Sequence, residues 1–213
     1  MKKWALLLAF FAALAPRAPA APLERDLGQG LAYFRIHSIL LDLPSDESVR
    51  QRPCVLDVRY VRGDRAAAAT LFTWLKSHAG PKSPVFLLAN PETAPVLLVP
   101  LNPANSVPGL VVLGPAARNF EPDISVSVTP KVERQAYDAL ENGVSIDSLL
   151  SAPVEKQRYD EERLDREHVD ESAPEPAADG VQPAQPPSPP HLIDPVLQRA
   201  VQLDRGLLAL RRL

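Results

Sequence analysis

The sequence predicts an α/β domain in which helices cover a mostly parallel sheet. Short runs of consecutive apolar residues, Val85–Ala89 and Leu110–Leu113, are typical of strands that are buried on both faces. An Ala-rich stretch with a broad apolar face, Arg65–His78, has the pattern of an amphipathic helix between such strands. Because strands and helices alternate along the chain, right-handed crossovers over a layered sheet are the expected connections.

Residues 1–20 have the three-part pattern of a secretory signal peptide. Lys2 and Lys3 supply the positive start, and an apolar run follows from Trp4 to Ala15. The small-residue sequence Ala18-Pro19-Ala20 then predicts cleavage after Ala20. That run is about a dozen residues long, whereas a membrane-spanning helix needs roughly 20. We therefore expect cleavage, no stable membrane span afterwards, and an exported protein that is periplasmic or extracellular. A retained anchor is the alternative.

Residues 21–150 are expected to hold the compact domain. Aromatic and branched residues, or alternation of apolar and polar residues, predict further strands over Leu31–Ile36, Val55–Val61 and Ile124–Val128. Asp64 is placed to cap the helix of residues 65–78, and Gly80-Pro81 is placed to end it. A second helix is predicted over Pro130–Leu140, with its proline in the first turn.

Residues 151–190 are expected to form a linker. Charge is dense over Glu155–Glu171, which predicts a solvated segment. The following stretch, Ser172–Pro190, holds many of the chain's 24 prolines and few large apolar residues. Such a segment buries too little apolar surface to offset the entropy lost on ordering, so we expect it to be disordered.

Residues 191–213 are expected to form a C-terminal amphipathic helix that starts at Asp194-Pro195. The predicted apolar stripe repeats at spacings of three and four and consists of Val196, Ala200, Leu203, Leu207 and Leu210. A stripe of this kind needs a partner surface. It either folds back on its own domain or engages another chain.

Composition excludes several classes of function. The net charge of −3 offers no basic face for nucleic acid. The four histidines and the single cysteine, Cys54, show no paired metal-ligand spacing, and no glycine-rich phosphate loop is present. We therefore expect no metal and no cofactor. Cys54 itself is expected to be a buried apolar side chain without an activating base.

Several polar residues are candidates for chemistry, but a structural role is the simpler interpretation. Asp57, Arg59 and Asp123 stand at predicted strand ends, where carboxylates and guanidinium groups bond turns. Serines that could act as nucleophiles are found outside any G-x-S-x-G elbow, at Ser38, Ser106 and Ser125.

Five segments, in order, resemble the catalytic domain of the tail-specific (carboxyl-terminal processing) serine peptidases, which has a crotonase/ClpP-like fold. Over about residues 30 to 150 the matching segments are Leu31–Ser38, Val55–Arg59, Pro84–Ala94, Gly109–Gly114 and Glu121–Thr129. The most specific matches are Leu56-Asp57-Val58-Arg59 and Pro122-Asp123-Ile124. The family's terminal helix, "D-P-x-L-x-x-A", resembles Asp194–Ala200, which favours a helix that folds back on its own domain.

The same resemblance implies that the catalytic site is degenerate. Pro95 stands where the family has its nucleophilic serine, and it has neither a hydroxyl group nor an amide hydrogen. No lysine lies between Lys82 and Lys131 to serve as the general base, and Arg118, the basic residue in that interval, stays protonated. Gly63 is the one glycine left in the segment that replaces the family's oxyanion loop.

These features predict an exported, non-catalytic peptidase-like domain that acts as a binding or assembly module for a protein or peptide. The alternative is an exported serine hydrolase or peptidase whose active site uses a serine at another position.

Overall fold

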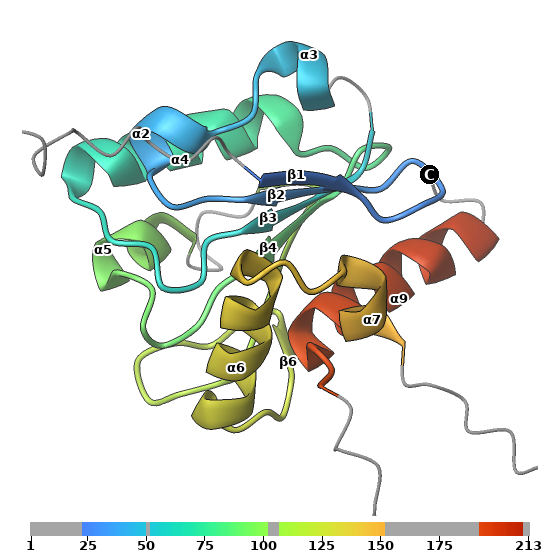
Figure 1. Ribbon diagram of the computed structural model, residues 1–213. Coiled ribbons are helices and arrows are strands. Elements are labelled where there is room, and N and C mark those ends of the chain that lie inside the picture. Colours follow the sequence, from blue (N-terminus) through green and yellow to red (C-terminus); the bar gives the residue numbers. More distant parts are fainter. Residues whose placement is uncertain (1–22, 50–51, 102–106, 152–191, 211–213) are drawn as a thin grey trace, which may run out of the picture. The chain divides into compact units, whose positions relative to one another are not determined.

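The computed structural model describes residues 23–49, 52–101, 107–151 and 192–210 (Figure 1). These residues fall into two compact units: unit 1 comprises the part up to Ser127 together with the chain from Arg199, and unit 2 comprises the part from Val128 to Gln198. The predicted signal peptide and the predicted linker after Ser151 lie outside the described residues.

Unit 1 is built on a six-stranded sheet whose strands lie side by side in chain order. β1 pairs antiparallel with β2, and every pairing from β2 to β6 is parallel. The mixed α/β architecture that the sequence predicts is therefore present. The strands are β1 (Leu23–Asp26), β2 (Ala32–Arg35), β3 (Cys54–Asp57), β4 (Val85–Leu88), β5 (Leu110–Gly114) and β6 (Ile124–Ser125).

In unit 1, α4 (Arg65–His78) contacts α2 (Ile39–Asp42), and the two helices lie side by side (Figure 1). The bounds of α4 agree with the prediction, and the Asp64 carboxylate caps it by accepting from Ala67 N at 2.9 Å. Apart from α9, the helical elements of this unit are α2 (Ile39–Asp42), α3 (Asp46–Val49), α4 (Arg65–His78), α5 (Pro95–Leu98) and the 3-10 helix η2 (Val99–Leu101).

Both faces of the sheet are buried, as the continuous apolar strands predict. On one face Leu56 and Leu87 pack in a core with Leu71 and Leu75 of α4. The other face carries residues that are also fully buried, among them Phe86. The strand residues thus alternate between two buried environments.

The sheet differs from the prediction at three strands, β1, β3 and β6. β1 was not predicted, because Leu23–Asp26 is polar and mostly exposed and its pairing with β2 is the interaction that makes it a strand. The predicted strand Val55–Val61 stops at Asp57, since Tyr60 adopts a φ of 64° that no strand tolerates. β6 is only two residues long, Ile124–Ser125.

Unit 2 contains α6 (Pro130–Glu141), α7 (Ile146–Leu150) and the first turn of α9 (Pro195–Ala209). α6 was predicted, with Pro130 as its first residue; α7 was not, because five residues are too few to show a helical period. Backbone and side-chain hydrogen bonds join the start of α9 to α7: Asp194 N donates to Leu149 O, and Gln198 Nε2 donates to Leu150 O, each at 2.9 Å.

The predicted apolar stripe of α9 is wrong in part. Val196 and Ala200 are fully buried, but Leu203 and Leu207 are half-buried and Leu210 is 72% exposed. The buried face instead continues through Leu197, Val201 and the carboxyl group of Asp204. Burial raises the pKa of Asp204. The buried face ends at a charged residue, Asp204, so the sequence pattern did not predict it.

Candidate functional site

The carboxyl ends of β3, β4 and β5 lie next to one another because these strands are parallel neighbours. Gly63 follows β3, Pro95 follows β4 and Arg118 follows β5. Ligand sites in parallel sheets form at this edge. The structure thus gathers near one edge of unit 1 the segments that carry the three positions at which the sequence departs from the peptidase pattern.

The turn from β4 to α5 is fixed by Asn90 and Thr93, which are almost fully buried. Asn90 Oδ1 accepts from the backbone N–H groups of Glu92 at 3.2 Å and Thr93 at 3.0 Å. The Thr93 hydroxyl accepts from Asn90 N and lies 3.1 Å from Val58 O, to which it can donate. This network ties the β4 turn to the end of β3 and sets the position of Pro95.

Replacing Thr93 tests how firmly this turn is held. Thr93→Val keeps the shape of the side chain but leaves buried polar groups of Asn90 and Val58 without the hydroxyl. We expect the free energy of unfolding to fall by about 1–3 kcal/mol in urea titrations.

Thr70→Val is the matched control, because the Thr70 hydroxyl donates to a helical carbonyl, Ala66 O, at an exposed site. We expect that change to be less than about 0.5 kcal/mol. Equal losses for the two variants would show that the turn network contributes no particular stability.

The β3–α4 loop lies against α5. Ala94 N, directly before α5, donates to Val61 O at 2.9 Å. A Cβ atom added at Gly63 would come within 2.8 Å of Leu97 Cδ2, so the glycine permits a close approach of this loop to the helix. The loop is therefore packed against the helix, and Gly63 itself does not line the pockets at this edge.

Two pockets, of about 600 Å³ and 200 Å³, occupy this edge of unit 1. Both are lined by Pro95 and Arg118, so the structure brings together two of the three residues singled out from the sequence. Apolar walls come from Leu98 and Phe120, and Asp123 of the larger pocket accepts from Val112 N at 2.8 Å. The larger pocket is thus an apolar depression with charged groups at its border.

The lining of these pockets offers little for nucleophilic catalysis. The larger pocket has no serine, threonine, cysteine, histidine or lysine among its described residues. The smaller one adds Thr93, whose hydroxyl is buried in the network of the turn. Arg118 stays protonated and cannot serve as a base. Glu121 and Asp123 supply carboxylates to the larger pocket, but its described lining has no hydroxyl or thiol group for them to activate.

A buried charged cluster lies beside this edge. Arg59 binds Asp57 with two guanidinium hydrogen bonds, 3.0 Å from Nε and 2.7 Å from a terminal nitrogen, and Tyr33 donates to Asp57 Oδ2 at 2.9 Å. Burial alone would raise the pKa of Asp57, but the Arg59 charge and hydrogen bonds, with Arg35 beside them, hold it below its usual value.

Tyr33 belongs to the same cluster. Burial, followed by the Asp57 charge, keeps the pKa of Tyr33 well above its usual value. At neutral pH the Asp57 carboxylate therefore stays charged and the Tyr33 hydroxyl keeps its proton. The contacts between Asp57 and Arg59 at the end of β3 are of the kind that a structural role requires.

The other candidate residues are scattered. Cys54 is fully buried on β3, where burial raises the pKa of its thiol to about 12, so it is not a thiolate nucleophile. His78 bonds Trp74 O and the Asp46 carboxylate. Ser106, His168 and His191 lie outside the described residues. Among the described residues no three acidic, histidine or cysteine side chains are grouped as metal ligands.

The sequence did not reveal the Asn90–Thr93 network or the apolar wall from α5 and Phe120. The Asn-Pro-Glu-Thr stretch is a turn signal, but Val58, which accepts a hydrogen bond from Thr93, is 35 residues away in the sequence.

In the part of the chain that the structure describes, no helix has the length and apolar character needed to cross a bilayer.

Comparisons with known proteins do not identify a family for this chain. No family model matches this chain, and no curated protein matches it. Among solved structures, a lipoprotein from Streptococcus agalactiae aligns with 58% of this chain and 70% of its own length, at 12% identity and a TM-score of 0.35. That similarity is too low to support any conclusion about fold family or function.

Proposed function

We propose that this chain is an exported, non-catalytic domain of the tail-specific peptidase type, which binds a protein or peptide at the edge formed by the ends of β4 and β5. The observation that carries the proposal is the position of Pro95. It is the first residue of α5 and lines both pockets, at the place where the resemblance puts the nucleophile.

The character of the pocket supports a peptide-like ligand. Its volume of about 600 Å³ is within the range of sites that hold small ligands or a few side chains. Leu98, Val99 and Phe120 provide apolar contacts, and Val99 is 69% exposed. Arg118 and Asp123 are charges of opposite sign that can orient a polar backbone.

The crotonase/ClpP-like layering is part of the same proposal. Its support is the unbroken parallel row from β2 to β6 in chain order, in which α4 and α5 lie in successive connections and contact each other. The proposal that the protein is exported rests on the signal-peptide pattern of residues 1–20 in the sequence.

A fluorophosphonate probe distinguishes a binding module from a hydrolase. We expect no labelling of the folded protein, because the pocket lining has no nucleophile with a base beside it. Pro95→Ser should also remain unlabelled, since it restores the hydroxyl but no lysine. Labelling of any serine, abolished when that serine is replaced, would instead establish the alternative, a hydrolase with a relocated site.

Binding is tested with a displayed library of random peptides, selected on the folded protein. Val99→Glu and Arg118→Glu alter the pocket at exposed positions and should weaken the selected peptides roughly tenfold or more. Leu41→Asp, at an exposed position that does not line this pocket, is the control and should leave their affinity unchanged. Equal effects of all three variants would contradict a binding site here.

A further inference from the structure

β6 is the last strand of the sheet, so its outer side has no neighbouring strand in the described part of the chain (Figure 1). On the inner side, Val126 N donates to Gly114 O of β5 at 2.9 Å. Successive residues of an extended chain direct their backbone groups to opposite sides, so the N–H and C=O groups of Ser125 and Ser127 face outwards. Together these groups form the outer edge of β6.

The outer edge of β6 is open. Ser125 and Ser127 are both exposed, and among the described residues no hydrogen bond occupies the outward backbone groups of either one. Ile124 and Val126 are half-buried, so burial alternates along residues 124–127 with the two-residue period of a strand. The chain therefore presents backbone donors and acceptors at the spacing that a further strand requires.

This edge also lacks the usual protection against pairing. Edge strands that remain single commonly carry charged residues or prolines, which discourage the addition of another strand. Ser125–Thr129 contains neither a charged residue nor a proline, and it alternates hydroxyl residues with valine, a strong strand former. The strand pattern thus continues past the two residues that pair with β5, and the open edge is suited to pair with another chain.

The larger pocket lies on one face of the sheet beside this edge. Ser125 pairs with Gly114, and residues that pair side by side direct their side chains to the same face. Val112 and Asp123 each lie two residues before this pair, so they share that face, and both line the larger pocket. A strand added to β6 would therefore place every second side chain on the face that carries the pocket.

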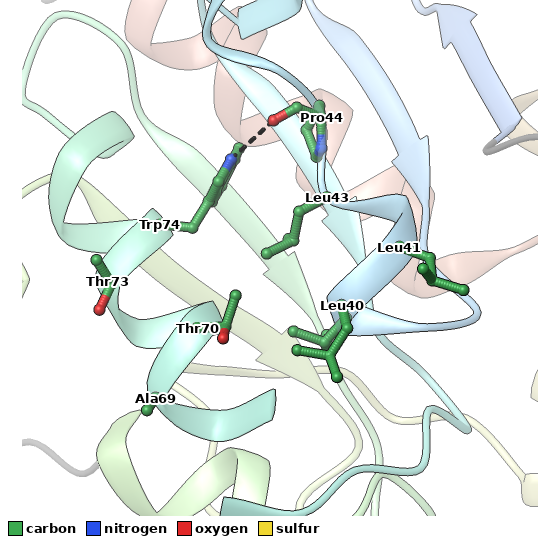
Figure 2. Close-up of a pocket in the computed structure, with 9 residues that line it drawn as sticks. Leu40, Leu41, Leu43, Pro44, Ala69, Thr70, Thr73 and Trp74 are labelled. Carbon is green, nitrogen blue, oxygen red and sulfur yellow. Dashed lines mark hydrogen bonds between the residues drawn. The ribbon is translucent and has the colours of Figure 1, made fainter. Parts of the chain in front are cut away.

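Another groove of unit 1 lies between α2 and α4 and has a volume of about 520 Å³ (Figure 2). Its lining is uncharged and includes Leu40 and Leu41, which are 61% and 71% exposed. The indole N–H of Trp74 already donates to Pro44 O at 2.9 Å. Apolar contacts of this kind do not select one backbone conformation of a ligand, whereas the open groups of Ser125 and Ser127 select an extended one.

We propose that the peptide ligand binds by strand addition, extending the sheet at the outer edge of β6 and inserting an apolar side chain into the larger pocket between Leu98 and Phe120. This inference rests on the proposed function and adds to it the conformation of the ligand. The backbone of Ser125 and Ser127 supplies affinity for any extended chain, and the pocket supplies the preference for an apolar side chain.

Two substitutions at one position separate the backbone from the side chain. The Ser125 N–H makes no bond to β5, so Ser125→Pro removes an outward donor without removing a hydrogen bond of the sheet. It should weaken the peptides selected on the folded protein by roughly three- to tenfold. Ser125→Ala removes only the hydroxyl group and should leave their affinity unchanged. Far-UV circular dichroism and urea unfolding check that both variants are folded.

A second measurement uses the unaltered protein. Each amide of a selected peptide is N-methylated in turn, which removes one backbone donor and adds bulk where the donor was. In an added strand only alternate amides face β6, so binding should fall by roughly tenfold at every second position and change little at the positions between. Replacing the apolar anchor residue of the peptide with alanine should weaken binding as well.

The outcomes distinguish strand addition from the proposed function. If no peptide is selected, both fail. If binding depends on Val99 and Arg118 but responds equally to Ser125→Pro and Ser125→Ala, or if the methylation scan has no two-residue period, the pocket binds peptides and strand addition is wrong. Weakening by Leu41→Asp would place the peptide in the groove between α2 and α4 instead. A dimer in sedimentation experiments that Ser125→Pro dissociates would make the edge an interface between copies.

Discussion

Asp57→Asn should lower the free energy of unfolding by about 3–5 kcal/mol, because it removes one partner of a fully buried ion pair. Asp57 and Arg59 are at most 1% exposed, and the guanidinium contacts both carboxylate oxygens. The asparagine has the same shape but no charge, so the buried Arg59 loses the carboxylate that compensates it. Urea unfolding followed by circular dichroism measures the difference.

The exposed pair Arg134–Asp138 on α6 is the control. Its atoms are 2.9 Å apart, between the 2.7 Å and 3.0 Å of the buried pair, but its side chains are about half exposed. Asp138→Asn should cost less than about 0.5 kcal/mol, because water screens the interaction. If Asp57→Asn cost no more than Asp138→Asn, the buried cluster would not stabilise the sheet.

The buried pair Asp57–Arg59 should make the stability of the fold depend on pH, in a direction that follows from the pKa of Asp57. The pKa of Asp57 is lowered in the folded protein, so this residue stabilises the fold above the pKa of the unfolded carboxyl group and loses that contribution as pH falls through its folded value. The stability difference between wild type and Asp57→Asn should therefore be constant near neutral pH. It should shrink below about pH 4.

Leu197→Ala should lower the free energy of unfolding by about 2–5 kcal/mol, the usual cost of a cavity at a fully buried leucine. Leu197 is completely buried on α9, one residue after Val196. Its amide also donates to the capping carboxylate of Asp194 at 3.1 Å, so the backbone there is fixed and cannot easily collapse into the space. Thermal and urea unfolding measure the effect.

Leu210→Ala, one residue after the end of α9, is the control and should change stability by less than about 0.5 kcal/mol, because Leu210 is 72% exposed. Deleting 194–213 removes the whole buried face and should lower the melting temperature further or cause aggregation. A deletion variant that keeps full stability and only changes its oligomeric state would show that α9 is an assembly element instead.

The long helices α4, α6 and α9 and the central strands could be predicted because their signals are local. α4 carries its own cap at Asp64, and β4 is a continuous apolar run. The apolar face of α9 was predicted less well, since Asp204 interrupts the pattern that Leu197 and Val201 continue. A burial environment created by distant residues is not encoded in the period of one segment.

At the candidate site, too, some properties follow from the residues alone and others depend on the fold. That Pro95 cannot be a nucleophile and Arg118 cannot be a base follows from the residues alone, because side-chain chemistry of this kind does not depend on the fold. That these two residues line the same pockets while Gly63 packs against α5 became known from the folded chain. Parallel pairing of β3, β4 and β5 brings their carboxyl ends together, and that proximity arises from hydrogen bonds between strands tens of residues apart.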